Sequence, residues 1–207
     1  MVELGLQKGD QIALNRRTLK KIPYYPTVDD LCYKILNNEG WNYKRNCEEY
    51  LIRDRSLVSL LYILALRISE ALRLKKDQFI HQGDRILVRG IKLSKSRWKD
   101  KPRKEQYRGN NYLPLDGPRR ELTLLILRYL DTLEYDDERL FKFTNGRALQ
   151  ITSALLGIPN HWLRAYGEDY LYSMWKHDII AVSDYVKVDE RTLSDYIRRR
   201  AEKYPTV

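Results

Sequence analysis

Residues 54–74 read DRSLVSLLYILALRISEALRL and carry the clearest structural signal in the chain. Apolar residues occupy nearly every helical face over 55–66, which predicts a helix buried in the core. A break is predicted near Arg67, followed by a second short helix over 69–74, capped by its first residue, a serine. Because Arg67 directly follows a wholly apolar helix, a functional guanidinium is favoured over an ordinary ion pair with Glu70.

The rest of the chain predicts a mainly helical domain with a small antiparallel β-sheet, an α+β fold. Further helices are predicted over residues 27–38, 122–133, 148–156, 161–175, 179–186 and 190–201. The β-prone segments 85–93 and 112–115 predict a hairpin, and residues 140–143 (LFKF) predict a short strand-like piece. We expect residues 1–25 to form an arm or linker and residues 26–207 to form one domain.

The long loop of this hairpin is strongly basic. With its flanks it carries Arg89, Lys92, Lys95, Arg97, Lys99, Lys101, Arg103, Lys104 and Arg108, opposed only by Asp100 and Glu105. The whole chain has a formal net charge of +10, so a polyanion is the expected partner. A solvated loop is the alternative, but Trp98 and Tyr107 interleave with the charges and favour a surface that neutralises phosphates.

Composition narrows the class of protein. Hydrophobic residues make up 43% and charged residues 32% of the chain, as in folded globular proteins. No apolar run reaches the roughly 20 residues that span a bilayer, and the N-terminus lacks the apolar core of a signal peptide. Cys32 and Cys47 have the spacing of neither a zinc site nor a disulfide framework. We therefore expect a cytoplasmic protein with no membrane segment and no metal.

Two motifs and the elements between and after them resemble one known family. Residues 54–74 resemble the first signature box of the tyrosine recombinases, or integrases, and His-Trp-Leu-Arg at 161–164 resembles their second box, His-x-x-Arg. A lysine-bearing hairpin lies between the boxes, as it does in the family. Lys187 and Tyr196 then follow at the separations that the family uses for a His or Lys and for its nucleophilic tyrosine.

The resemblance implies the catalytic domain of a site-specific recombinase or integrase that forms a 3′-phosphotyrosine intermediate. Arg67 and Arg164 would hold the scissile phosphate through forked hydrogen bonds, with Glu70 orienting the site. Tyr196 would attack phosphorus, and because a phenol has a pKa of about 10 it needs a nearby cationic field to do so.

The remaining site residues would manage protons. The resemblance implies that Lys92, or else Lys95, protonates the departing 5′ oxygen, and the sequence leaves both open. His161 and Lys187 would add hydrogen bonds to the phosphate or tune the proton transfers. Because the phosphotyrosine stores the bond energy, we expect no ATP, metal or other cofactor. The implied partners are double-stranded DNA attachment sites and further copies of the chain in a homo-tetramer.

Several features depart from the family pattern. Ala165 stands where the second box continues with histidine, Lys187 stands where the usual Leu-Gly-His ends, and the N-terminal clamp domain is reduced at most to residues 1–25. These departures are typical of a divergent member, with an archaeal virus or plasmid as the expected source. Tyr185, eight residues after His177, is the alternative nucleophile, although that alignment deletes residues after the second box.

Two other functions compete with recombination. A DNA-binding protein could keep this fold and lose catalysis, as the missing second-box histidine allows. A type IB topoisomerase-like enzyme would use the same chemistry as a monomer, but controlled DNA rotation needs an enclosing clamp. Two arginines, a hairpin lysine and a spaced tyrosine together favour an active recombinase.

Overall fold

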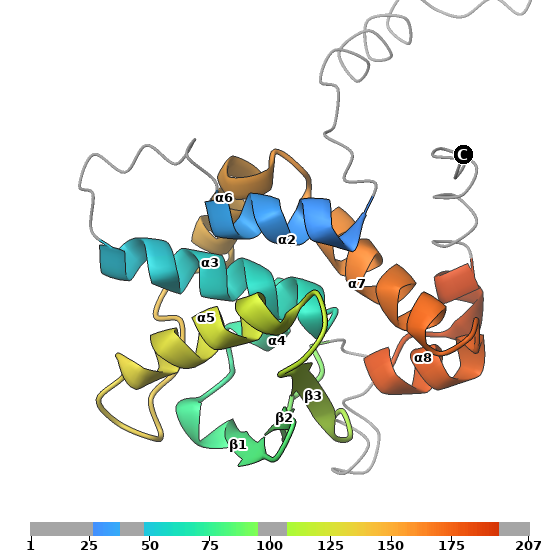
Figure 1. The fold of residues 1–207 in the computed structure, drawn as a ribbon, viewed down its shortest axis with the longest axis horizontal. Coiled ribbons are helices and arrows are strands. Elements are labelled where there is room, and N and C mark those ends of the chain that lie inside the picture. The colour runs from blue at the N-terminus through green and yellow to red at the C-terminus, as the bar shows by residue number, and fades with distance from the viewer. Residues whose placement is uncertain (1–26, 38–47, 95–106, 195–207) are drawn as a thin grey trace, which may run out of the picture.

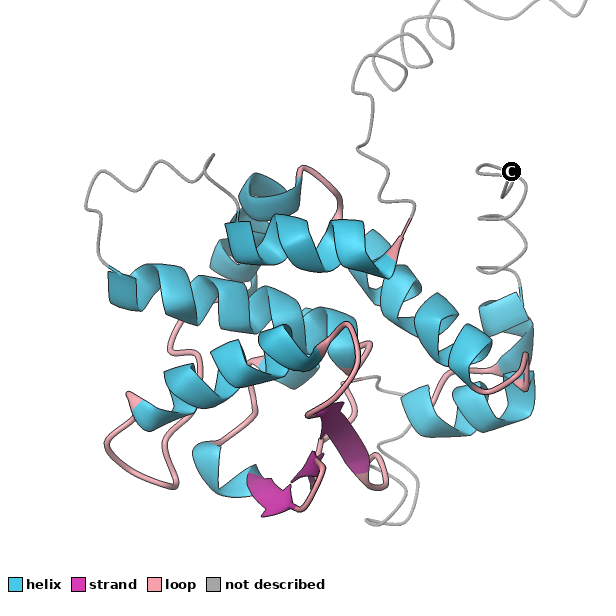
Figure 2. Ribbon diagram, viewed as in Figure 1, coloured by secondary structure: helices cyan, strands magenta, loops and turns pink. Residues whose placement is uncertain are grey.

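The computed structural model describes residues 27–37, 48–94 and 107–194. Over these ranges the chain is mainly helical, with one small antiparallel sheet to one side of the helices (Figure 1, Figure 2). This arrangement confirms the predicted fold class. The predicted arm over residues 1–25 lies outside the described residues.

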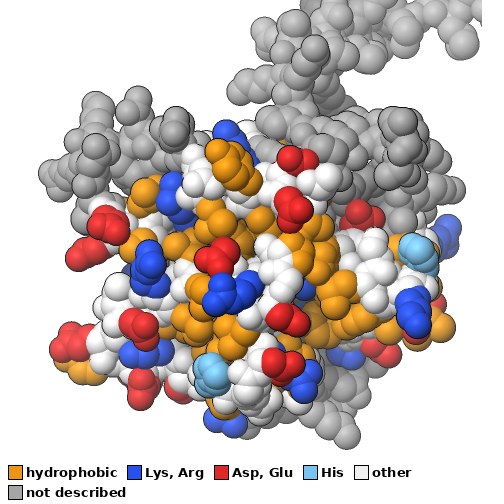
Figure 3. All heavy atoms as spheres, viewed as in Figure 1, with side chains coloured by type: hydrophobic (Ala, Val, Ile, Leu, Met, Phe, Trp, Pro, Cys, Tyr) orange, Lys and Arg blue, Asp and Glu red, His pale blue; other side chains and the backbone are white. Residues whose placement is uncertain are grey.

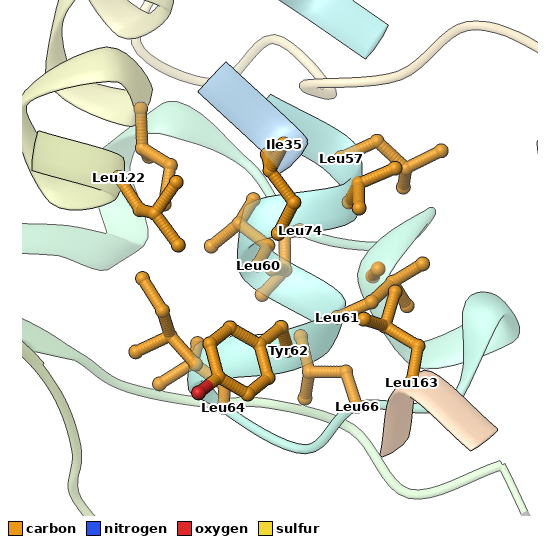
Figure 4. Close-up of a cluster of buried hydrophobic side chains, with 14 of the residues drawn as sticks. Ile35, Leu57, Leu60, Leu61, Tyr62, Leu64, Leu66, Leu74, Leu122 and Leu163 are labelled. Atoms are coloured by element: carbon orange, nitrogen blue, oxygen red, sulfur yellow. The ribbon is translucent and has the colours of Figure 1, made fainter. Parts of the chain in front are cut away.

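Helix α3 (Glu48–Ile63) is the centre of the fold. Besides the short helix that follows it, α3 contacts α2 (Val28–Asn37), α5 (Arg120–Asp131), α6 (Asn145–Leu156) and α7 (Asn160–Met174). Its last two turns are buried on every side, and Ile35, Leu122 and Leu163 from three of these helices close the core around them (Figure 4). Each such side chain stabilises the fold by about 1.5–3 kcal/mol. The predicted buried helix is confirmed, although it begins two turns earlier, with Glu48 and Glu49 in its first turn.

Helix α3 ends before the predicted residue 66. The chain leaves the helix after Ile63 because Ala65 takes a left-handed backbone conformation, with φ of 46°. That conformation costs a residue other than glycine about 1–2 kcal/mol. Helix α4 (Ile68–Ala71) then begins directly after Arg67, so the predicted serine cap is wrong and Ser69 lies inside α4. This sharp turn holds Arg67 and Glu70 beside the carboxyl end of α3.

The sheet has three antiparallel strands in the order β1-β2-β3: β1 (Phe79–Gln82), β2 (Arg85–Val88) and β3 (Asn111–Pro114). The pair β2–β3 confirms the predicted hairpin with shorter strands, and a bridge from Lys92 to Tyr107 continues it toward the basic segment. Strand β1 was not predicted, because its sequence, FIHQ, places two apolar residues before two polar ones and lacks the alternation typical of a strand. It follows a 3-10 helix (Lys76–Gln78) and turns into β2 at Gly83, with φ of 58°.

The carboxyl-terminal helices largely follow the predictions. The hydroxyl of Thr144 caps α6 by accepting from the Arg147 amide, and Gly157 ends that helix in the left-handed conformation, as predicted. Helix α8 (Ile179–Val186) has the predicted bounds, and residues 190–194 are helical, while residues 195–201 of that predicted helix lie outside the described ranges. Residues 140–143 form no strand, and two of them, Leu140 and Phe141, are buried in the core instead.

Gly167 brings α7 unusually close to α3. A Cβ atom added at Gly167 would lie 2.2 Å from the carbonyl oxygen of Tyr62 and 3.2 Å from the Cβ of Ala65. Only glycine leaves room for this crossing. Arg164 lies on α7 about one turn before Gly167, so the close approach carries that arginine to the carboxyl end of α3.

The surface drawn in Figure 3 mixes Lys and Arg with Asp and Glu side chains, and it shows no single large basic patch. The described basic side chains are therefore not concentrated on that face. Among the described residues, no helix is both long and apolar enough to cross a bilayer.

Candidate functional site

Glu70 is the centre of a buried cluster of charged side chains at the carboxyl end of α3. Its side chain is fully buried. Oε1 accepts hydrogen bonds from Nη1 of Arg67 at 2.8 Å and from the hydroxyl of Ser94 at 3.3 Å. Oε2 accepts from the backbone amide of Arg67 at 3.0 Å and from Nη2 of Arg108 at 3.3 Å. One carboxylate thus links helix α4, the turn before it and the chain segment on either side of the basic loop.

Arg164 reaches the same cluster from α7. Its Nε donates to Oε1 of Glu168 at 2.6 Å, and its Nη1 lies 3.9 Å from Oε2 of Glu70. Both terminal nitrogens, Nη1 and Nη2, are buried and make no hydrogen bond within the described part of the chain. Buried guanidinium nitrogens without acceptors are costly, so Arg164 presents donors that suit an anion.

Electrostatics keep the cluster positive. Burial alone would raise the pKa of Glu70, but Arg108, Arg164 and Arg67 together hold that pKa below its usual value. Burial and the neighbouring Arg164 lower the pKa of Arg67, while Glu70 opposes them. Three guanidiniums therefore face two carboxylates, those of Glu70 and Glu168. A cluster with one unbalanced positive charge and free donors can bind a phosphate.

The predicted general acid and histidine lie nearer the surface. Lys92 is exposed, one residue before buried Leu93, on the strand extension that bridges to Tyr107. His161 is exposed in the first turn of α7, one turn before Arg164, so the two share a helical face. Desolvation lowers the pKa of His161, which favours its neutral form. Lys95, the alternative acid, lies outside the described residues.

Lys187 and Tyr185 occupy the carboxyl end of α8. Lys187 ends that helix in the left-handed conformation, and its Nζ lies 3.7 Å from Oδ1 of Asp184, so the ion pair that the structure shows for it is local. Tyr185 packs edge-on against Trp175, and its hydroxyl accepts a hydrogen bond from the amide of Tyr112 in β3 at 3.1 Å. Burial raises the pKa of Tyr185, which disfavours a phenolate.

The predicted DNA-contacting residues divide into three groups. Arg89 is exposed just after β2. Arg108 was predicted to lie on the DNA-facing surface, and the structure corrects this: its side chain is fully buried and paired with Glu70. The remaining predicted DNA-contacting residues lie outside the described ranges: Arg97, Lys99, Lys101, Arg103 and Lys104. The predicted nucleophile, Tyr196, lies outside them too.

Sequence reasoning missed several members of the cluster. Glu168 was readable, because an acidic residue four positions after Arg164 lies on the same helical face. Ser94 and Arg108 were not, because only the tertiary fold brings the two ends of the basic segment to Glu70. The described residues contain no group of three or more His, Cys, Asp or Glu arranged to hold a metal ion.

Two solved structures of the XerH site-specific recombinase share this fold. One shows XerH bound to its difH substrate in a pre-cleavage complex, with a TM-score of 0.59 and 19% identity over 88% of this chain and 52% of that chain. The other shows a post-cleavage complex on palindromic difH, with a TM-score of 0.56 and 18% identity over 90% of this chain and 53% of that chain. The chain thus spans about half the length of these recombinases.

No protein-family model matches the sequence, and no curated protein sequence matches it either. The likeness to solved structures therefore lies in the fold, which is that of a tyrosine recombinase catalytic domain. The buried arginine cluster is built within that fold.

Proposed function

We propose that the protein is a tyrosine-type site-specific DNA recombinase that cleaves and rejoins double-stranded DNA through a 3′-phosphotyrosine at Tyr196. One observation carries the proposal: Arg67 and Arg164, far apart in sequence, converge on Glu70, and the terminal nitrogens of Arg164 have no hydrogen-bond acceptor within the described residues. Planar guanidiniums with free donors suit the non-bridging oxygens of a phosphodiester. The fold that the chain shares with XerH supports the same function.

The chemistry follows from the charges. Arg67 and Arg164 bind the scissile phosphate and offset the negative charge that builds up on it in the transition state. The oxygen of Tyr196 forms a bond to phosphorus and gives up its proton, which neutral His161 is suited to accept. The bond from phosphorus to the 5′ oxygen breaks, and Lys92 or Lys95 protonates that oxygen. Reversal of these steps on a second DNA end rejoins the strand without a cofactor.

The proposed partners are DNA attachment sites and three further copies of the chain. The basic segment with Lys99, Lys101 and Arg103 is proposed to bind the DNA backbone. Replacing these residues should reduce the slope of binding affinity against salt by about one unit for each phosphate that is no longer neutralised. An unchanged slope would exclude this segment from the DNA interface. Integration of a viral or plasmid genome stays a prediction from the sequence.

A covalent-adduct assay tests the proposal. The full-length protein is incubated with a pool of nicked duplexes of varied sequence, and covalent protein–DNA complexes are separated under denaturing conditions. Tyr196→Phe should abolish the adduct while DNA binding persists. Tyr185→Phe is the matched control and should retain it, because the Tyr185 hydroxyl is bonded to β3.

Each other outcome identifies a competing function. An adduct that survives in Tyr196→Phe but is lost in Tyr185→Phe would reassign the nucleophile. DNA binding with no adduct on any duplex would show a DNA-binding protein without catalysis. Adduct formation on every sequence, with relaxation of supercoiled plasmid by the monomer, would show a topoisomerase-like activity instead.

A further inference from the structure

Arg108 is buried more completely than any other arginine of the cluster. Its guanidinium donates from Nη1 to the carbonyl oxygen of Leu64 at 2.7 Å and from Nη2 to that of Ala65 at 3.0 Å. Nη2 also contacts Oε2 of Glu70 at 3.3 Å. Burial lowers the pKa of Arg108 to about 10, so the group still carries its charge at neutral pH. With its terminal nitrogens occupied in this way, Arg108 is poorly placed to bind a phosphate itself.

The carbonyls that Arg108 holds belong to the turn on which the site depends. The last carbonyls of a helix have no partner within it, and a cation there is favourable. Ala65 adopts its left-handed conformation at this turn, and Arg67 follows two residues later. A fixed guanidinium across Leu64 and Ala65 therefore fixes the direction in which the chain enters α4 and presents Arg67.

Arg108 also acts on the charge and position of Glu70. The charge of Arg108 counters the desolvation of Glu70 and lowers its pKa more than the charge of Arg164 or the charge of Arg67 does. Glu70 in turn holds both the backbone and the side chain of Arg67. If Glu70 became neutral or moved, Arg67 would lose its main partner and Arg164 would lose a neighbouring countercharge.

The backbone of Arg108 joins this cluster to the strand of the candidate general acid. Its amide donates to the carbonyl of Ile91 at 2.9 Å, and the neighbouring Tyr107 forms the bridge to Lys92. The side chain and backbone of one residue thus connect the carboxyl end of α3, the carboxylate that orients Arg67, and the strand that carries Lys92.

We propose that Arg108 is a positioning residue for DNA cleavage: its buried guanidinium fixes Glu70 and the α3–α4 turn, and so sets the geometry of Arg67, Arg164 and the Lys92 strand. This inference rests on the proposed recombinase function. It assigns Arg108 no contact with the phosphate, the nucleophile or the leaving group.

Arg119 offers a matched control. It too is a buried arginine at the end of α3, where Nη1 donates to the carbonyl of Ile63 at 3.3 Å, and its guanidinium lies 3.7 Å from the ring centroid of Tyr170. No ion pair or hydrogen bond joins it to Glu70 within the described residues. A residue that merely stabilises the end of α3 should behave like Arg119, and a positioning residue should not.

The experiment compares Arg108→Lys and Arg108→Met with Arg119→Lys in the full-length protein. Thermal unfolding, DNA affinity and the single-turnover rate of adduct formation are measured on the same nicked duplexes. We expect Arg108→Lys to slow adduct formation on the order of a hundredfold, as small misplacements of catalytic groups do. DNA affinity should stay within about threefold, because phosphate contacts elsewhere dominate binding. Arg119→Lys should lower stability without a comparable change in rate.

The dependence of cleavage rate on pH separates the two roles, because a residue that only stabilises the fold would leave it unchanged. Without Arg108, desolvation of Glu70 is less well countered, so the pKa of Glu70 rises and the carboxylate is lost at higher pH. Arg108→Met should therefore show a new fall in cleavage rate as pH decreases, absent in wild type and in Arg119→Lys. Adding Glu70→Gln to Arg108→Met should remove that new fall.

The outcomes separate this inference from the proposed function. No adduct with the wild-type protein on any DNA refutes the proposed function itself. Normal adduct formation by both Arg108 variants, or equal slowing in Arg119→Lys, overturns the positioning role. Failure of both Arg108 variants to fold while Arg119→Lys folds would assign Arg108 to the folding core and would also overturn it.

Discussion

Two carboxylates along the same stretch of chain are buried to the same extent, but their pKa values are shifted in opposite directions. Asp54 in α3 and Glu70 in α4 both have fully buried side chains. Oδ1 of Asp54 accepts from Nε of Arg53 at 2.8 Å, but its Oδ2 has no hydrogen-bond partner within the described residues. Burial raises the pKa of Asp54 to about 7, whereas three guanidiniums hold the pKa of Glu70 below its usual value.

The difference shows that burial alone drives a carboxyl toward its neutral form, and that surrounding guanidiniums are needed to keep it charged. Around Glu70 the fold supplies guanidiniums from the turn before α4, from α7 and from the end of the basic segment. Around Asp54 it supplies one arginine directly, with Arg147 acting from farther away. A charged Glu70 is what the proposed site needs, because only the carboxylate can orient several arginines at once.

The largest effect is expected from Glu70→Gln, which removes the countercharge and keeps the shape. Two buried guanidiniums and the partly buried one of Arg67 would then share only Glu168, so the free energy of unfolding should fall by about 3–5 kcal/mol. Chemical denaturation at neutral pH measures this. The matched control is Glu121→Gln, which breaks the exposed ion pair with Arg120 and should cost at most about 1 kcal/mol. Equal costs for the two variants would mean that Glu70 is not the electrostatic centre of the cluster.

The second-largest effect is expected from Gly167→Ala, which tests whether the close crossing of α7 and α3 places Arg164 beside Glu70. Gly167→Ala places a methyl group against the carbonyl of Tyr62, and backbone atoms cannot move aside cheaply. We expect a loss of about 1–3 kcal/mol in stability, with α7 displaced from α3 and slower adduct formation. Gly146→Ala is the control, since a Cβ there meets only the Thr144 hydroxyl at 3.8 Å. A Gly167→Ala protein as stable and active as Gly146→Ala would refute the close-packing argument.

The sequence predicted the elements of this fold better than the contacts of its site. Local patterns were sufficient for the buried part of α3, for α8 and for the stop of α6 at Gly157. Strand β1 was missed because it lacks alternation, and the end of α3 was misplaced because nothing local requires a left-handed alanine. Arg108 was read as part of a basic surface, since charge composition does not reveal which arginine turns inward.

For the two candidate arginines, the sequence predicted that they share a site but not which contacts bring them together. Their positions in the motifs predicted a shared site, and the structure brings Arg67 and Arg164 to one carboxylate. What the motifs could not supply is the means: the crossing at Gly167, the turn at Ala65 and the buried Arg108 are all long-range packing features. Tyr196 and Lys95 lie outside the described residues, so their roles stay predictions.

The smallest effect is expected from Asp54→Asn, and it has the opposite sign. The folded pKa of Asp54, about 7, lies above its ordinary value of 3.8, so between these values the folded state binds more protons than the unfolded state. The stability contribution of Asp54 therefore falls as pH rises through this window and stays low above it. At about pH 8, Asp54→Asn should stabilise the protein by about 1 kcal/mol, because the gain from removing a buried charge is partly offset by losing the Arg53 ion pair.

The stabilisation should shrink as pH falls from about 7 toward 3.8, because below the lower value Asp54 is protonated in both the folded and the unfolded state. Denaturation curves of both proteins across this range measure the difference, which cancels the titration of the groups that they share. Asp131→Asn, at an exposed position on α5, controls for the loss of a carboxyl as such. A difference between Asp54→Asn and wild type that is constant with pH would show Asp54 to be charged throughout. The contrast between one guanidinium and three would then not explain why Glu70 is ionised.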